Sequence, residues 1–176
     1  TEDIIRKEVA DYQDSHKEIA IKALKRFGNL IPPILTVLVY NTEEKDFTYL
    51  ILPVDANFFS SKPAKEFFIN HVVPQNLERM VEQHLIPTAL SMSMEATMKM
   101  GDKSRSIEDV MENGTPVDVL MHSFETLNGT TVELYKMEKA DTQVVNEDGD
   151  VINDYNLELL DVGKGETPQV EGIFAN

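Results

Sequence analysis

Apolar side chains recur every three or four residues over residues 3–27, with charged residues between them, and this spacing predicts an amphipathic helix. Gly28 ends that helix, and Pro32-Pro33 prevents it from resuming. Two apolar runs follow, at 34–40 and 47–54, and the six polar residues between them predict a hairpin. Because both faces of each run are largely apolar, we expect these strands to lie centrally in a sheet that helices cover on at least one side.

A second helical region is predicted after Ser60-Ser61, with Pro63 in its first turn. Pro74 lies far enough inside to kink this helix or to divide it into two successive helices. We expect the region to end at Pro87. Its later part places one group of residues on a common face, namely Val73, Leu77, Met80, Val81, His84 and Leu85.

The chain alternates strictly between apolar and polar residues from Ala89 to Met100, which predicts a strand. One face would pack against the second helix and the other would be open to solvent. The expected buried residues are Leu90, Met92, Met94 and Met98, and the expected solvated ones include Ser91, Ser93 and Thr97.

The rest of the chain predicts further short elements. These are a helical turn capped by Ser106, a hairpin of 117–127 and 130–137 around Asn128-Gly129, and short strands near 142–145 and 157–162. The order α-β-β-α-β-(α)-β-β-β-β predicts an α+β fold, with an antiparallel sheet of about six strands and two main helices packed on it. We expect one domain at 1–162 and a C-terminal tail at 163–176.

Three segments carry a resemblance: Leu52-Pro53 at the end of the first hairpin, 94–98 in the alternating strand, and 116–120 in the next strand. In this layout the chain resembles small uncharacterised bacterial and phage proteins of the α+β class. Thr97 stands where those proteins have an aromatic residue, and Asp118 where they have a basic one. The resemblance supports the fold and a phage or bacterial origin, and it implies no known activity.

The net charge of the protein argues against some classes of binding partner. Asp and Glu number 31 against 16 Lys and Arg, a formal net charge of −15 at pH 7. This balance argues against direct binding of nucleic acid, which needs clustered basic residues, and against anionic membrane surfaces. The sequence has no apolar run of membrane-spanning length and no cysteine. We therefore expect a protein of the cytoplasm, or of the host cytoplasm or virion if it is phage-encoded.

Glu95 and His122 are the best candidates for acid–base chemistry. If the strands that carry them pair, the carboxylate could orient the imidazole, as general acid–base catalysis requires. Asp118 and Glu133 could share that face. The alternative, which we prefer because no nucleophile or glycine-rich loop accompanies the pair, is that these side chains are solvated on the open face of the sheet.

The sequence predicts neither a metal site nor a cofactor. No two histidines have zinc-ligand spacing, and His16 and His84 lie on or beside apolar helix stripes, where a packing role is expected. Asn146, Asp148 and Asp150 alternate as calcium ligands do, but Gly149 comes too early for a calcium loop of the EF-hand type. An Asx-Gly turn is the preferred interpretation.

The last fifth of the chain is the most acidic: residues 141–176 hold nine acidic residues and a single basic one, Lys164. Such a surface either keeps the protein soluble or binds a basic partner. The candidate partner-binding residues are the apolar Phe58, Phe59, Ile173 and Phe174 and the acidic Asp148 and Asp150.

We therefore expect a non-enzymatic protein-interaction module that binds a basic protein partner, as an inhibitor or as a structural component, or that self-associates. In the tail, Ile173 and Phe174 are expected to dock on a neighbouring chain rather than on their own domain. The alternative function is a small enzyme that uses Glu95 and His122.

Overall fold

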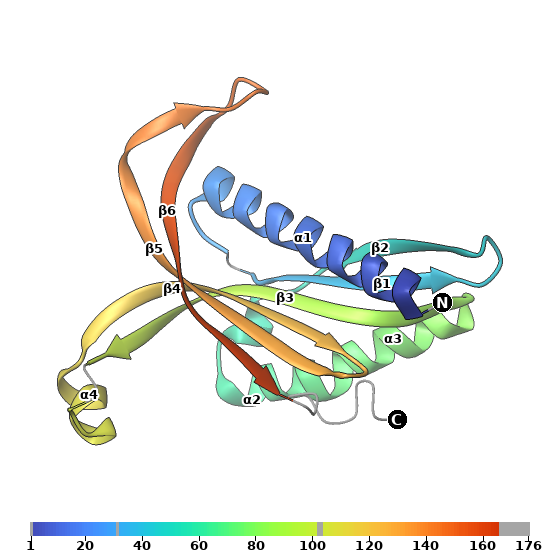
Figure 1. Cartoon of the computed structure of the whole chain (residues 1–176), viewed down its shortest axis with the longest axis horizontal. Coiled ribbons are helices and arrows are strands. Elements are labelled where there is room, and N and C mark those ends of the chain that lie inside the picture. The colour runs from blue at the N-terminus through green and yellow to red at the C-terminus, as the bar shows by residue number, and fades with distance from the viewer. Residues whose placement is uncertain (1, 31, 102–103, 166–176) are drawn as a thin grey trace.

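The structure is a computed structural model that describes residues 2–30, 32–101 and 104–165. It is an α+β fold, in which one antiparallel sheet of six strands has the order β2-β1-β3-β4-β5-β6 (Figure 1). The elements are α1 (Glu2–Phe27), β1 (Ile34–Asn41), β2 (Asp46–Leu52), a 3₁₀ turn (Ala56–Phe59), α2 (Lys62–Phe67), a π-helical turn (Phe68–Val72), α3 (Val73–Glu82), β3 (Leu85–Met100), α4 (Ile107–Asn113), β4 (Thr115–Thr126), β5 (Gly129–Val145) and β6 (Val151–Gly165).

The long N-terminal helix is confirmed. Its buried residues, Tyr12, His16, Ala20 and Leu24, recur every four positions and form one face against the sheet. Gly28 ends α1 in a left-handed conformation, with φ 74°, and its N–H donates to the carbonyl of Leu24 at 2.8 Å.

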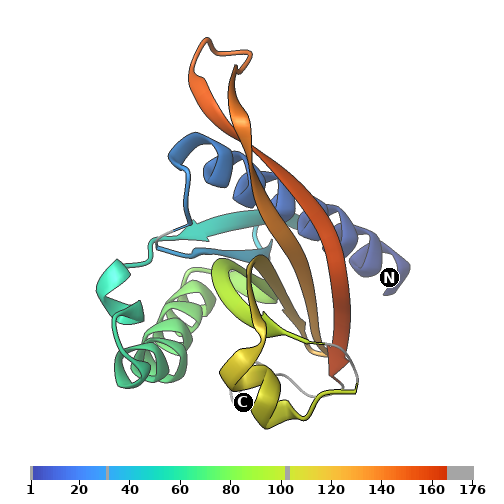
Figure 2. The same cartoon turned by 90° about the vertical axis from the view of Figure 1, so that its left-hand side faces the viewer.

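Helices cover both faces of the sheet, as the turned view in Figure 2 also shows. On β1, Leu35, Val37 and Val39 join a core cluster with α3, whereas Leu38 packs with Tyr12 of α1. β1 therefore lies between two helical layers, which explains why both of its faces are apolar and confirms the central position expected from the sequence.

The second helical region is divided in two, as predicted. Ser61 caps α2 by accepting the Ala64 N–H on its Oγ at 3.2 Å, and a π-helical turn precedes α3, which carries Pro74 in its first turn. The predicted end at Pro87 is wrong. The chain leaves the helix at Glu82, and His84 takes a left-handed φ of 64°, so that His84 and Leu85 are not on the helical face.

Pro87 lies inside β3 rather than before it. Ala89 pairs with Leu38 and Pro87 pairs with Val39, so the pairing skips one residue of β3 at this point. A proline has no N–H to donate to a neighbouring strand, and such an irregularity is where a sheet accepts it. The strand therefore begins four residues earlier than the alternation predicts.

The alternation of β3 is real, but the expected solvated face is partly covered. Leu90 is buried and Met92 packs beside it against α3, while Met94 and Met98 are only half-buried. Ser91 and Ser93 are 1% and 0% exposed on the opposite face, under α1. A period of two separates the faces of a strand without telling which of them a helix covers.

The C-terminal half has fewer and longer strands than predicted. The Ser106 cap, the helical turn α4 and the hairpin around Asn128-Gly129 are confirmed. Residues 142–145 are the far end of β5, and 157–162 lie within β6. Residues 163–165 pair with β5, so the sheet continues into the predicted tail, and 166–176 lie outside the described residues. No helix in the described ranges is long and apolar enough to cross a membrane.

Candidate functional site

A chain of buried polar side chains connects α1 to three strands of the sheet. Tyr12 Oη lies 2.9 Å from both the carbonyl oxygen and Oγ1 of Thr36. His16 contacts Thr36 Oγ1 through Nδ1 and Ser93 Oγ through Nε2, each at 2.7 Å. Ser93 Oγ in turn lies 2.5 Å from Nδ1 of His122. The chain therefore runs from Tyr12 through Thr36, His16 and Ser93 to His122.

Local structure brings these residues together. Tyr12 and His16 are four residues apart on α1 and so share its sheet-facing side. Ser93 of β3 pairs directly with His122 of β4, and Thr36 of β1 pairs with Ser91, two residues before Ser93. Residues two apart on a strand share a face, so the three strands present their polar groups side by side under α1.

Both histidines of this buried network, His16 and His122, are neutral at pH 7. Burial lowers the pKa of His16 to about 3, with the neighbouring His122 as a second cause. Burial also lowers the pKa of His122 to about 4, assisted by the positive charge of Lys17. Burial raises the pKa of Tyr12 to about 12. The network is therefore uncharged, which is the state that costs least in a buried site.

The positions of the hydrogens follow from counting them. Five contacts join these groups, and the two hydroxyls, the phenol and the two neutral imidazoles supply one hydrogen each. A carbonyl cannot donate, so Tyr12 donates to the Thr36 carbonyl and Thr36 Oγ1 donates to Tyr12. His16 must then donate from Nδ1, Ser93 donates to His16 Nε2, and His122 donates from Nδ1 to Ser93.

This assignment leaves Nε2 of His122 as an acceptor. It has no hydrogen-bond partner among the residues that the structure describes, although His122 is completely buried. An unsatisfied buried polar atom is uncommon and calls for an explanation.

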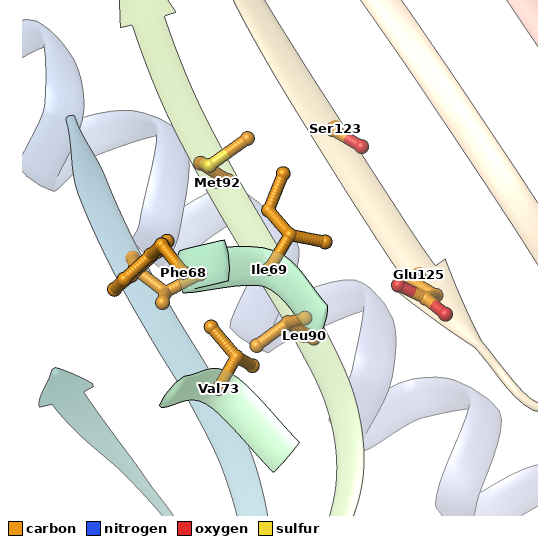
Figure 3. A pocket seen from close by; sticks show the side chains of 8 residues that line it. Phe68, Ile69, Val73, Leu90, Met92, Ser123 and Glu125 are labelled. Atoms are coloured by element: carbon orange, nitrogen blue, oxygen red, sulfur yellow. The ribbon is translucent and has the colours of Figure 1, made fainter. Parts of the chain in front are cut away.

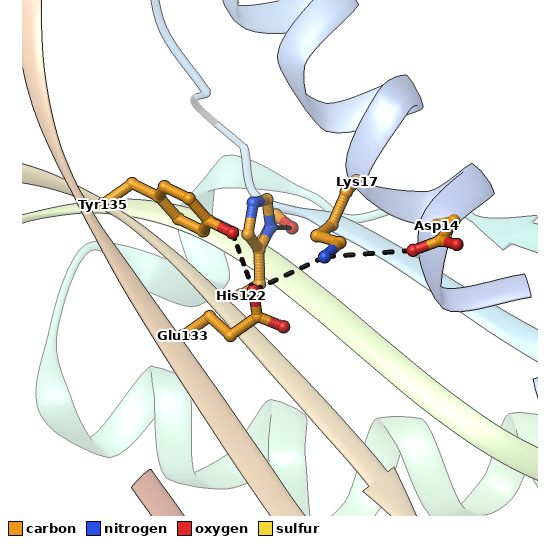
Figure 4. A network of polar contacts seen from close by, with 6 residues as sticks. Asp14, Lys17, His122, Glu133 and Tyr135 are labelled. Carbon is orange, nitrogen blue, oxygen red and sulfur yellow. Dashed lines mark hydrogen bonds and ion pairs between the residues drawn. The ribbon is translucent and has the colours of Figure 1, made fainter. Parts of the chain in front are cut away.

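A groove of about 490 Å³ lies beside His122, between α1 and the strands β4 to β6. Its lining comprises Asp14, Lys17, Glu18, Ile21, His122, Tyr135 and Leu157. Figure 4 shows the polar contacts next to it: Lys17 Nζ is 3.4 Å from Glu133 Oε1, and the Tyr135 hydroxyl donates to the same oxygen at 2.8 Å. Burial and the carboxylate of Glu133 raise the pKa of Tyr135 to about 12.

The candidate pair of Glu95 and His122 does not form, and the preferred expectation that both side chains are solvated is wrong for His122, which is buried under α1. The two strands pair as expected, but Glu95 lies opposite Leu120, and its Oε1 accepts the N–H of Leu30 at 2.8 Å. Ser93 takes the place beside the imidazole. Glu133 lies opposite His122 as expected for a shared face, while the exposed Asp118 accepts from Thr97 Oγ1 at 3.1 Å.

Ser93 and His122 have the separation of a nucleophile and its base, but their burial prevents that chemistry. Their side chains are 0% exposed, so a substrate cannot reach the Ser93 hydroxyl in this conformation. A histidine with a pKa near 4 is also a weak base at neutral pH. The arrangement serves instead to fix α1 against β1, β3 and β4 through directional contacts.

Three buried side-chain atoms lack a hydrogen-bond partner among the described residues: besides His122 Nε2 and the neighbouring Ser91 Oγ, the third lies on the opposite side of the sheet. Glu125 is 5% exposed, its Oε1 has no partner within the described part of the chain, and burial raises the pKa of its carboxyl to about 7. It faces a small cavity of about 40 Å³ under the π-helical turn, which Phe68, Leu90 and Met92 also line (Figure 3). This space is large enough for a water-sized molecule.

The predicted partner-binding residues that the structure describes lie on two different elements, the 3₁₀ turn and the β5–β6 hairpin. Phe58 and Phe59 are half-buried, with ring centres 5.1 and 5.5 Å from that of Phe68, and their partner-binding role stays a prediction. The 3₁₀ turn lets both rings contact the same core residue. Ile173 and Phe174 lie outside the described residues, and their partner role stays a prediction.

The Asx-Gly turn at the end of the β5–β6 hairpin is confirmed. Asn146 Oδ1 accepts the N–H groups of Asp148 and Asp150, at 3.0 and 2.9 Å, and Gly149 takes a φ of 84°. Both aspartates are exposed. The described residues contain no cluster of three or more side chains placed to hold a metal ion.

Two of the other predicted residues have different surroundings from those expected. His16 is buried, and besides packing it contacts two hydroxyls, those of Thr36 and Ser93. His84 is exposed, with Nε2 3.7 Å from Glu43 Oε1. The sequence did hold a signal for the buried network, because Tyr12 and His16 interrupt an apolar stripe that Ala20 and Leu24 continue.

Comparison of the chain with protein-family models, with curated proteins and with solved structures finds no match. We therefore infer its function from the residues themselves.

Proposed function

We propose that this protein is a non-enzymatic interaction module and that the outer part of its β5–β6 hairpin, residues 138–158, binds a basic protein partner. The observation that carries this proposal is the surface of that segment, called here the acidic arm. It extends past the end of α1 and away from the helices (Figure 1) and holds seven acidic residues and one lysine.

The end of the acidic arm combines negative charge with exposed apolar side chains. Glu147, Asp148 and Asp150 form no ion pair with any residue in the described ranges. Val145 and Val151 pair across the hairpin and are 67% and 61% exposed. Acidic residues alone would suffice for solubility, whereas exposed valines beside them favour a contact surface.

The base of the acidic arm is held against the end of α1. The Tyr155 hydroxyl donates to the carbonyl of Gly28 at 2.9 Å, and Asn153 Nδ2 donates to the carbonyl of Lys25 at 3.4 Å. Lys25 Nζ also lies 3.7 Å from Asp154 Oδ1. Such support reduces the entropy that an isolated two-stranded hairpin would lose when a partner binds.

A partner with alternating basic and apolar side chains is the class that this surface favours. The carboxylates of the arm accelerate association with a basic partner and repel acidic molecules, nucleic acids among them. Apolar side chains of the partner would cover the exposed valines. The partner is therefore expected to be a protein segment rich in lysine or arginine.

The test compares two variants with the same change in charge. A synthetic peptide of alternating lysine and valine is titrated by calorimetry into the wild type, into E147Q/D148N/D150N, and into E43Q/E44Q/D46N, which removes three exposed carboxylates from the β1–β2 turn. We expect the arm variant to bind about tenfold more weakly, from about 0.5 kcal/mol for each charge, and the control to stay within about twofold. If both variants bind the peptide equally weakly, binding depends on the net charge of the protein and not on the acidic arm, and the proposal is refuted.

A further inference from the structure

A groove of about 430 Å³ lies between the N-terminal half of α1 and the turn that joins β4 to β5. Ile5 and Val9 of α1 and Leu127 of the turn supply its apolar side chains. Leu127 is 69% exposed and Ile5 is 39% exposed. Apolar side chains that gather around a concave surface are typical of a docking site, whereas single exposed ones are ordinary.

The described part of the chain ends beside this groove. Gly165, at the end of β6, pairs with Thr130, which lies three residues after Leu127. Residues 166–176 therefore begin next to the turn that forms one side of the groove. Ile173 is eight residues past Gly165, and an extended chain of that length spans up to about 28 Å. The groove is thus within reach of this segment.

The segment 166–176 has the chemistry that complements the groove. Its large apolar side chains are Val170, Ile173 and Phe174, and both of its charged residues are glutamates. Arg6 belongs to the lining of the groove and has no ion-pair partner within residues 2–30, 32–101 and 104–165. Apolar side chains would cover the exposed apolar lining, and a carboxylate would balance the guanidinium.

We propose that residues 166–176 dock in this groove of their own chain, with Ile173 and Phe174 against Ile5 and Leu127. The sequence alone favoured a neighbouring chain as the docking site. The position of Gly165 favours the same chain, because a segment tethered this closely has an effective concentration of about a millimolar, which a second molecule in dilute solution does not reach. The groove lies at the opposite end of the β5–β6 hairpin from the acidic arm, so this docking does not depend on the proposed partner.

The experiment introduces a single tryptophan, as F174W, into a chain that has none. A docked indole should emit at a shorter wavelength than free tryptophan and be shielded from quenching by acrylamide. L127Q removes an apolar side chain from the groove, and I107Q removes an 80% exposed one from α4 as the matched control. We expect L127Q to make quenching about threefold faster and I107Q to change it less than about 1.5-fold. Both replaced side chains are exposed, so neither change should unfold the protein.

Two further variants of the F174W protein test the charge in the groove. R6Q removes the cation from the lining, and K7Q removes the adjacent cation outside it. We expect R6Q to make quenching about twofold faster and K7Q to leave it unchanged. In the protein without tryptophan, deletion of residues 166–176 should shift the backbone amide resonances of Ile5 and Leu127 and leave that of Ile107 in place.

Dilution distinguishes docking on the same chain from docking on a second copy. The shielding of the indole in F174W should stay constant from about 1 to about 100 µM protein, because a tethered segment does not respond to dilution. The proposal is overturned if the indole is as accessible as free tryptophan or if L127Q and I107Q have equal effects. It is also overturned if shielding rises with protein concentration, which would place the segment on a neighbouring chain.

Discussion

Ser93 and His122 lie opposite each other on β3 and β4, and the Oγ of Ser93 is 2.5 Å from the Nδ1 of His122 in a region closed to solvent. His16 contacts the same hydroxyl from α1 at 2.7 Å. One serine hydroxyl thus joins two strands and a helix. Such contacts have strict geometry, so they define how α1 sits on the sheet.

Replacing Ser93 by alanine should destabilise the fold. The change leaves Nε2 of His16 without a donor and Nδ1 of His122 without an acceptor, both in a buried site. We expect the free energy of unfolding to fall by about 2–4 kcal/mol, measured by urea denaturation at pH 7. Thr97→Ala on the same strand is the control, because Thr97 is exposed, and it should cost less than about 0.5 kcal/mol. A similar loss in both variants would contradict the role given to Ser93.

Acid should unfold this protein through its two buried histidines. Their pKa values are about 3 and about 4 in the folded state, below the ordinary 6.5, so the unfolded chain binds more protons between these limits. The stability contributed by these two histidines is therefore complete above pH 6.5 and falls as the pH drops toward 4, with a slope from the pair that approaches about 2.7 kcal/mol per pH unit. Urea denaturation across this range measures the slope.

The control for the acid effect replaces the two other histidines, as H71Q/H84Q. Both of those residues are exposed, so the pH dependence of their variant should match that of the wild type. If H71Q/H84Q loses the dependence of stability on pH, His16 and His122 are not the source of that dependence.

Glu125 should have the opposite pH dependence. Burial raises the pKa of its carboxyl from 4.5 to about 7, so the folded state holds a proton that the unfolded chain has released. Its contribution is complete below pH 4.5 and is lost as the pH rises through 7. Glu125→Gln should thus stabilise the protein by about 1–3 kcal/mol at pH 8 and change little at pH 4.5. Glu112→Gln, which removes an exposed carboxylate, should have no such effect, and equal values for Glu125→Gln at both pH values would exclude the raised pKa.

Local patterns predicted the fold because most elements are determined by nearby residues. The four-residue spacing in α1, the cap at Ser106 and the Asn128-Gly129 turn each act within a few positions, and each was found where expected. The prediction that the second helical region ends at Pro87 was wrong, because an irregularity in the pairing of β3 with β1 accommodates this proline inside the strand. That irregularity depends on a distant strand and has no local signal.

The sequence signals polar residues on the buried face of α1, but the strand residues that they contact could not be predicted, for a related reason. Alternation placed Ser93 and Glu95 on the same face, and pairing of β3 with β4 was expected, but the register decides which of them lies opposite His122. The register in turn places Ser93 there. The sequence also suggested that this face is open, whereas α1 covers Ser91 and Ser93 from the far end of the chain. Contacts between residues this far apart follow from packing alone.

The most direct test of the proposed function removes the acidic arm and keeps the body of the protein. Lys139 and Tyr155 pair across β5 and β6, so replacing residues 140–154 by Asn-Gly closes a shorter hairpin and retains the Tyr155 contact with Gly28. Calorimetry with the lysine–valine peptide at 0.05 and 0.15 M salt compares this variant with the wild type, after a melting curve confirms that it folds. We predict that the wild type binds with an affinity that falls as salt rises and that the shortened protein does not bind. Equal binding by both would contradict the account.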